Sequence, residues 1–320
     1  VLGVAFLLKA GMWPLGFWLP TTYSAASPPA AALFAMLSKV GVYAVLRVYL
    51  LLFGTQNSPT ANFGAEWLLY GGMATIAFGT IGVLACRTLP RLIGFSVLIS
   101  SGTLLAALGS GEGAVLGAVL FYLVSSTLAI SAFYLLAELI DRQEVGLAGV
   151  APVEAVFEDE DTQAFATEED EVGIVIPGTL AVLGGAFVLC SLLLAGLPPL
   201  SGFIAKFALI DGLLGLGTQV AVSTWVLIAL IIISGLATLI ATSRAGIDLI
   251  WTPDKPQPAL RLTEAAPVGM LLAICLALMI FAGPVMRYME RTGASLEDRD
   301  SYIRSVMEAT RSQPVGGMRQ

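Results

Sequence analysis

Histidine is absent from this chain of 320 residues, and charged residues make up only 12% of it. The lack of histidine excludes the usual haem ligand and the commonest proton-shuttling side chain. Soluble domains carry about 25% charged residues. The low charge, with 57% hydrophobic residues and a mean hydropathy of +0.87, therefore predicts a polytopic helical membrane protein.

Cysteine and nucleotide-binding motifs are also scarce. The three cysteines, Cys86, Cys190 and Cys275, are isolated in apolar segments, which indicates buried thiols rather than a disulfide framework or a metal site. No GxxxxGK[ST] motif occurs, so we predict that the chain does not itself hydrolyse nucleotide. We expect no cofactor and no metal ion. Val1 lies inside an apolar run without a preceding methionine; this is not a signal peptide, and we expect a fragment that lacks its amino-terminal part.

The net charge of −7 is concentrated in one segment. Residues 141–171 hold eleven acids and one arginine (−10), so the other residues hold fifteen bases and twelve acids (+3). Nothing in this distribution indicates a nucleic-acid partner. The most acidic part, 154–171, is typical of a solvated linker; a role in gathering cations is the alternative.

Apolar runs long enough to cross a bilayer, about 20 residues, occur eight times. They cover residues 1–19, 28–53, 67–86, 92–108, 113–140, 174–197, 220–242 and 267–288. We therefore expect an all-α transmembrane bundle over 1–290, interrupted by the acidic loop 141–173 and followed by a polar tail at 291–320.

Two of these runs contain helix breakers. Pro14 interrupts the first, and Pro198, Pro199 and Gly202 interrupt the sixth. Broken membrane helices are tolerated where they are buried in protein or line a cavity, and transporters place ion sites at such interruptions. The alternative for each break is a packing kink.

Only four lysines are present, and Lys9, Lys39 and Lys206 lie in apolar segments. A charged side chain at the bilayer centre costs roughly 2.5–3.5 kcal/mol or more. Lysine changes its pKa readily when buried, whereas arginine stays charged. We therefore predict that these three lysines translocate protons. The alternative, that Lys9 extends to the headgroups, remains open because Pro14 indicates a nearby break.

The sequence also predicts polar lines on two helix faces. Lys39, Tyr43 and Arg47 follow one another at i, i+4 and i+8, on one face. Hydroxyl and carboxylate side chains on one face of the fifth run form a second line, at i, i+4, i+7 and i+11: Thr127, Ser131, Tyr134 and Glu138.

The second line can hold water and pass protons, and Glu138 would be its entry or exit. The alternative is an interfacial glutamate and helix packing through small residues. The fourth run repeats the pattern with Ser96, Ser100 and Thr103, and for that run helix packing is favoured.

Three blocks of sequence resemble a known family. They are LLKAGMWPLGFWLPTTYSAASPPAAALFAMLSKVGVYAVLR (7–47), CRTLPRLIGFSVL (86–98) and LAGLPPLSGFIAKF (194–207). Together they resemble proton-translocating antiporter-like subunits, most closely the D-type subunits of the Mrp/Pha/Mnh multisubunit cation/proton antiporters, which are related to membrane subunits of respiratory complex I. The resemblance covers about residues 1–288 and implies the carboxy-terminal eight of fourteen helices.

The resemblance implies roles for the same lysines. Lys9 matches the lysine beside a first broken helix, Lys39 a connecting lysine, and Lys206 the lysine of a second broken helix; a partner glutamate is implied on an earlier helix. The family often has histidine where Gly16 stands, and histidine or lysine where this chain has SSTLAIS (125–131). The Glu138 line is the candidate substitute, and these departures resemble the potassium-exporting Pha branch.

The expected function is therefore that of a non-enzymatic subunit of a sodium- or potassium-exporting cation/proton antiporter. It would lie in the bacterial inner membrane with other membrane subunits as partners. Two alternatives remain: a proton-pumping subunit of a complex I-like dehydrogenase, and a non-conducting scaffold.

Overall fold

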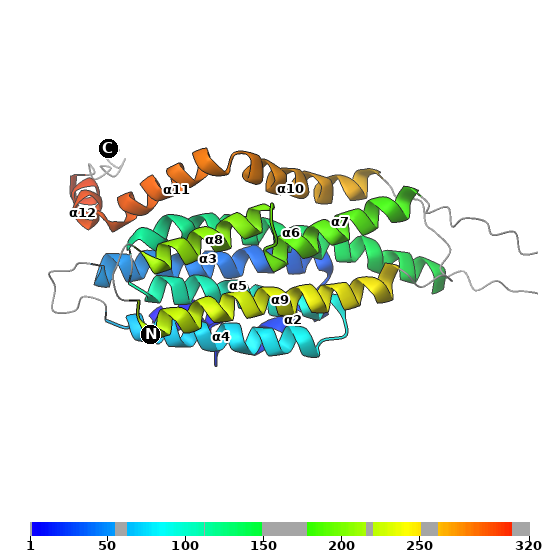
Figure 1. Ribbon diagram of the computed structural model, residues 1–320, viewed down its shortest axis with the longest axis horizontal. Helices are drawn as coiled ribbons and strands as arrows, with labels where there is room; N and C mark the ends of the chain where they lie inside the picture. The colour runs from blue at the N-terminus through cyan, green and yellow to red at the C-terminus, as the bar shows by residue number, and fades with distance from the viewer. Residues whose placement is uncertain are drawn as a thin grey trace, which may run out of the picture.

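The computed structural model describes residues 2–54, 63–111, 113–148, 178–215, 220–250 and 262–308, and within these ranges it is helical, with no strand. The helices are α1 (Leu2–Ala10), α2 (Trp18–Ala25), α3 (Pro28–Phe53), α4 (Ala65–Ala85), α5 (Leu89–Gly109), η1 (Gly113–Val115), α6 (Leu116–Ala148), α7 (Gly178–Ala195), α8 (Ser201–Leu214), α9 (Val222–Ile250), α10 (Leu262–Ile280), α11 (Ala282–Glu297) and α12 (Arg299–Glu308). The longer helices run along the long axis of the molecule (Figure 1). The expected all-α membrane bundle is confirmed, whereas the acidic segment 154–171 lies outside the described residues.

Five of the described helical stretches are long and apolar enough to cross a bilayer. They are Pro28–Phe53, Ala65–Ala85, Leu89–Gly109, Gly113–Ile140 and Val222–Ile247. Four of them match predicted runs closely, because uninterrupted apolar sequence with proline at the start, as in α3 and α5, fixes both helix and boundary. The chain is a multi-pass membrane protein.

Helix α5 forms the centre of the bundle. Nearly all of its residues are buried, and α2, α3, α4, α6 and α9 all pack against it. The α4–α5 contact depends on glycine: a Cβ at Gly72 would lie 2.5 Å from the backbone nitrogen of Ala106, and a Cβ at Gly102 would lie 2.8 Å from the carbonyl of Gly72. In lipid the hydrophobic effect does not drive helices together, so van der Waals packing through small residues stabilises their contact instead.

The two broken helices are built on the same local plan. Helix α1 ends before Gly11 (φ +79°) and α7 ends before Gly196 (φ +77°). The next amide in each case bonds back five residues, Met12 to the Leu7 carbonyl at 3.1 Å and Leu197 to the Leu192 carbonyl at 3.1 Å. A left-handed glycine with this long-range bond is the Schellman stop, which leaves other terminal carbonyls of the helix without a helical partner.

The helix breakers predicted from sequence occupy different places around these stops. Pro14 lies in the turn between α1 and α2, and Pro198 and Pro199 lie between α7 and α8. Gly202 instead belongs to the first turn of α8, where a Cβ would lie 2.0 Å from the Leu193 carbonyl. Its role is thus to let α8 approach the end of α7.

The last run, predicted as one span over 267–288, is not one continuous helix. Helices α10 and α11 meet at an angle of 85°. Pro284 explains the bend, since its ring would clash with the Ile280 carbonyl four residues earlier in a continuous helix. Helix α11 carries Arg287, Glu290 and Arg291 and runs on to Glu297, so charged sequence assigned partly to the tail belongs to this helix.

We predict that Gly202→Ala destabilises the protein, because the new methyl group would collide with a backbone carbonyl that cannot rotate away. Overpacking costs roughly 1–3 kcal/mol, which corresponds to a fall in Tm of about 2–5 °C for a chain of this length. Thermal unfolding of the detergent-purified protein measures this.

The matched control is Gly185→Ala on α7, where a Cβ meets nothing within 4 Å. Alanine is a better helix former than glycine, so this variant keeps or raises Tm. Equal Tm values for the two variants would contradict the close approach of α8 to α7.

Candidate proton-translocation site

The amine of Lys206 occupies the end of the broken helix α7. It donates hydrogen bonds to the Ala195 carbonyl at 2.8 Å and the Leu194 carbonyl at 3.2 Å, and the side chain is only 8% exposed. These are carbonyls of the last turn of α7, so the cation also faces the negative end of the helix dipole. Two glycines make room for it: a Cβ at Gly196 would lie 3.1 Å from Nζ and one at Gly235 3.4 Å.

The amine of Lys39 is held by hydroxyl groups instead. Lys39 is 2% exposed, and its Nζ donates to Ser100 Oγ and, at 3.3 Å, to Ser101 Oγ on the central helix α5. Ser100 also donates to the Val97 carbonyl at 2.9 Å. The serine run that the sequence assigned to packing therefore does both: it bonds its own helix and accepts from a buried amine.

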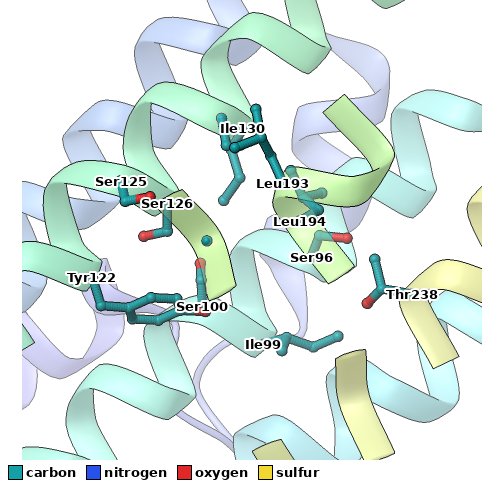
Figure 2. Close-up of a pocket in the computed structure, with 12 residues that line it drawn as sticks. Ser96, Ile99, Ser100, Tyr122, Ser125, Ser126, Ile130, Leu193, Leu194 and Thr238 are labelled. Atoms are coloured by element: carbon teal, nitrogen blue, oxygen red, sulfur yellow. The ribbon is translucent and has the colours of Figure 1, made fainter. Parts of the chain in front are cut away.

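A small cavity of about 20 Å³ lies between α5, α6, α7, α8 and α9, and both lysine environments contribute to its wall. Ser100, which accepts from Lys39, and Leu194, whose carbonyl accepts from Lys206, both line it (Figure 2). Gly202 of α8, the helix that carries Lys206, lines it too. Six hydroxyl-bearing residues line it: Ser96, Ser100, Tyr122, Ser125, Ser126 and Thr238. A volume of this size holds about one water molecule, and the walls offer it polar partners.

Several of these hydroxyls already have a partner for their proton. Ser126 donates to the Leu123 carbonyl at 3.3 Å, and Thr238 to the Ser234 carbonyl at 2.7 Å. Ser125 donates to Ser201 Oγ at 3.1 Å, at the start of the helix that carries Lys206. Their oxygen lone pairs remain to accept hydrogen bonds.

Sequence reasoning missed this side of α6. The predicted line on that helix was Thr127, Ser131, Tyr134 and Glu138, whereas Tyr122, Ser125 and Ser126 line the cavity. The sequence feature that could have pointed to this face of α6 was the serine pair in SSTLAIS (125–131). From sequence, that segment indicates only that the expected histidine or lysine is missing.

The predicted line on α6 has a mixed environment. Thr127 donates to the Leu123 carbonyl at 2.5 Å. Ser131 Oγ and Tyr134 hydroxyl are buried and have no hydrogen-bond partner among the described residues. Glu138 is half-buried and interacts with another group. Its part in proton transfer stays a prediction.

The line on α3 separates into two environments. Lys39 faces the core, whereas Tyr43 is 42% exposed. Arg47 is half-buried and has an interaction partner. The roles of Tyr43 and Arg47 stay predictions.

Lys9 is exposed on the described part of the chain and lies in the last turn of α1, two residues before Gly11. Its stem packs on α3, because a Cβ at Gly41 would lie 3.0 Å from Lys9 Cγ. The freed amide of Trp13 in this break donates to Thr75 Oγ1 at 2.8 Å. A hydroxyl of α4 thus accepts from a free amide at the first break, whereas the Lys206 amine donates to free carbonyls at the second.

The fold and these buried amines define a class of membrane protein. Residues 1–237 match the family model described as NADH:quinone oxidoreductase/Mrp antiporter, transmembrane, and the chain belongs to this family. The resemblance seen in the three sequence blocks is thereby confirmed.

Two named relatives show which subunits of such antiporters this chain is similar to. The chain is 52% identical to a protein of Rhizobium meliloti (strain 1021) named as the D subunit of a probable K(+)/H(+) antiporter, over 98% of this chain and 59% of the relative. It is 29% identical to the D subunit of the Na(+)/H(+) antiporter of Bacillus subtilis (strain 168), over 96% of this chain and 58% of the relative. The chain therefore spans about three fifths of the length of these relatives.

Solved structures share the fold. A chain of the Mrp complex from Dietzia sp. DQ12-45-1b matches with a TM-score of 0.75 at 20% identity, over 95% of this chain and 60% of that chain. A chain of respiratory complex I from Thermus thermophilus with bound NADH matches with a TM-score of 0.69 at 20% identity, over 92% of this chain and 57% of that chain.

We predict that Thr75→Val destabilises the protein, because the Trp13 amide loses its acceptor inside a membrane protein. A buried polar group left without a partner costs about 1–3 kcal/mol, and this bond is part-buried, so we expect a loss at the lower end of that range. Thermal unfolding in detergent measures the loss. Thr80→Val is the control, since Thr80 is also buried on α4 but, among the described residues, bonds only the Ile76 carbonyl of its own helix, at 2.7 Å. A Thr80→Val loss as large as that of Thr75→Val would count against a special role of Thr75.

Proposed function

We propose that this chain is part of a subunit of a secondary cation/proton antiporter in a bacterial inner membrane, with Lys39 and Lys206 as proton carriers. Other membrane subunits would be its partners. Potassium is the favoured cation, because the 52% identical relative carries the name of a K(+)/H(+) antiporter and the sodium-named relative is 29% identical.

One observation carries this proposal: two buried amines have their hydrogen-bond partners on the wall of one hydroxyl-lined cavity. An amine that accepts and releases a proton needs a partner for each protonation state. The carbonyls of α7 stabilise charged Lys206, and burial opposes that charge. Because these two effects oppose each other, neither the charged nor the neutral form of Lys206 is strongly favoured. This suits a group that changes its protonation state.

A water molecule in the cavity would connect the two amines. It would accept a proton from the Lys39–Ser100 pair and donate through the serine hydroxyls toward α8, where Ser201 bonds Ser125. The hydroxyls replace a titratable side chain here, so the proton passes through oxygen atoms that hold no net charge of their own.

Lys9 is proposed as the third carrier. The resemblance implies a glutamate on an earlier helix, and we propose that this glutamate is the partner of the exposed Lys9 side chain. Protons would then move along a line of lysines through the bundle.

We expect Lys206→Ala to abolish proton-coupled cation exchange, measured with a pH-sensitive dye in inverted membrane vesicles. Lys206→Arg is the decisive companion: arginine keeps the charge and donors for the α7 carbonyls but does not release its proton. This variant should assemble with normal stability and still be inactive. Exchange at the wild-type rate in Lys206→Arg would refute the carrier role.

Blocking the cavity should also slow exchange. Ser126→Val fills the space for the water and removes a hydroxyl, so we expect a fall of roughly tenfold or more in rate, by analogy with the loss of a positioned proton-transfer group. Thr127→Val changes the neighbouring hydroxyl on the line predicted from sequence. Loss of exchange in Thr127→Val with normal exchange in Ser126→Val would assign the conduit to that line instead.

A further inference from the structure

A second cavity, of about 370 Å³, lies at the end of the bundle where α4, α5 and α9 meet, away from the lysines. It is lined by Cys86, Arg87, Leu92, Ala241, Arg244 and Ala245. Helix α4 ends at Ala85 and α5 begins at Leu89, so the cavity lies beside the turn between two membrane-crossing helices. That position places it at the polar edge of the bilayer.

Two arginines line this cavity, and a third, Arg91, is close enough to act on the Cys86 thiol in its wall. Arg87 and Arg91 are exposed and, within the described part of the chain, take part in no hydrogen bond or ion pair. Arg244 bonds the Cys86 carbonyl at 2.5 Å and the Leu84 carbonyl at 3.1 Å, both through Nη2, which leaves Nε and Nη1 as donors. No acidic residue is among the described residues that line the cavity; in sequence, Asp248 follows Arg244 by four residues.

The start of α5 adds to the positive character. Its N-cap, Thr88, makes no side-chain hydrogen bond to the helix. The amides of Leu89 and Arg91, on either side of Pro90, are therefore not satisfied by a side-chain cap. Amides at a helix N-terminus favour an anion. Arginine matches the oxygen geometry of a phosphate group with paired donors.

The surface next to the arginines is apolar. Ile81 and Leu84 on α4 are 69% and 42% exposed, and Ile240 on α9 is 62% exposed. Ile81 and Ile240 lie on the membrane side of the arginines, one turn or more before Arg87 and one turn before Arg244. A ligand that fits both the arginine-lined cavity and the apolar surface beside it has an anionic head group and hydrocarbon chains.

We propose that this cavity binds the phosphate of an anionic phospholipid, with Arg87, Arg91 and Arg244 around the head group and the acyl chains along α4 and α9. A free phosphate would use the arginines and leave the apolar flank unused. An acidic peptide of a neighbouring subunit would not need the hydrocarbon surface either. Basic pockets between membrane helices are suited to such head groups.

The test is native mass spectrometry of the protein, purified in its membrane complex, after incubation with phosphatidylglycerol. Arg87→Gln with Arg91→Gln should lower occupancy of the tightest-bound phosphatidylglycerol about tenfold or more, from the contribution of each basic residue near an anionic head group. Arg287→Gln with Arg291→Gln, two exposed residues of α11 at the same spacing, is the matched control and should keep it.

Other outcomes overturn the proposal. These are equal occupancy in the two double variants, or equal retention of phosphatidylcholine by the wild type. Displacement of the lipid by millimolar glycerol phosphate would show a site for a free anion. A photo-reactive residue placed at position 87 should capture lipid; capture of a neighbouring subunit would assign the surface to a protein contact. Neither double variant alters Lys39 or Lys206, so exchange activity gives an independent control for folding.

Discussion

The bond between the Lys206 amine and the carbonyls at the end of α7 is the contact on which the candidate site depends. A helix that stops inside a membrane protein leaves carbonyls without partners, and a lysine there carries a charge that lipid does not solvate. The hydrogen bonds between them lower both energetic costs: the Lys206 amine donates to the carbonyls of Ala195 and Leu194, and these carbonyls stabilise its charge. The break and the lysine are thus one feature, and Gly196 and Gly235 provide the space for it.

The first break follows the same backbone plan but uses a different partner. Both breaks begin with a left-handed glycine and a five-residue backbone bond. In the first, Thr75 accepts from the freed amide of Trp13, and Lys9 remains at the surface of the described chain. Two similar interruptions, each beside a lysine, fit a protein built from related halves, a plan that transporter folds use repeatedly.

Between the two buried lysines, the cavity is lined by hydroxyl groups, in a chain that contains no histidine. Hydroxyls place polar atoms in the core at lower cost than a charge, because each bonds a carbonyl of its own helix, as Ser126 and Thr238 do. They also leave lone pairs toward a cavity. This arrangement keeps the core of α5 and α6 tightly packed while it provides polar contacts for one water molecule.

The sequence by itself determined the fold class, most membrane segments and the three lysines of interest, because hydropathy and helix breakers act locally along the chain. It also led to the family, through the blocks around Lys9, Lys39 and Lys206. The sequence did not predict the α10–α11 bend, where Pro284 interrupts the helix within an apolar run. It also did not predict which face of α6 lines the cavity. Only the tertiary structure decided that Ser100 bonds Lys39 and that Ser126 rather than Thr127 faces the cavity. Helical periodicity defines which residues share a face, but which face meets a neighbouring helix depends on packing between segments far apart in the chain.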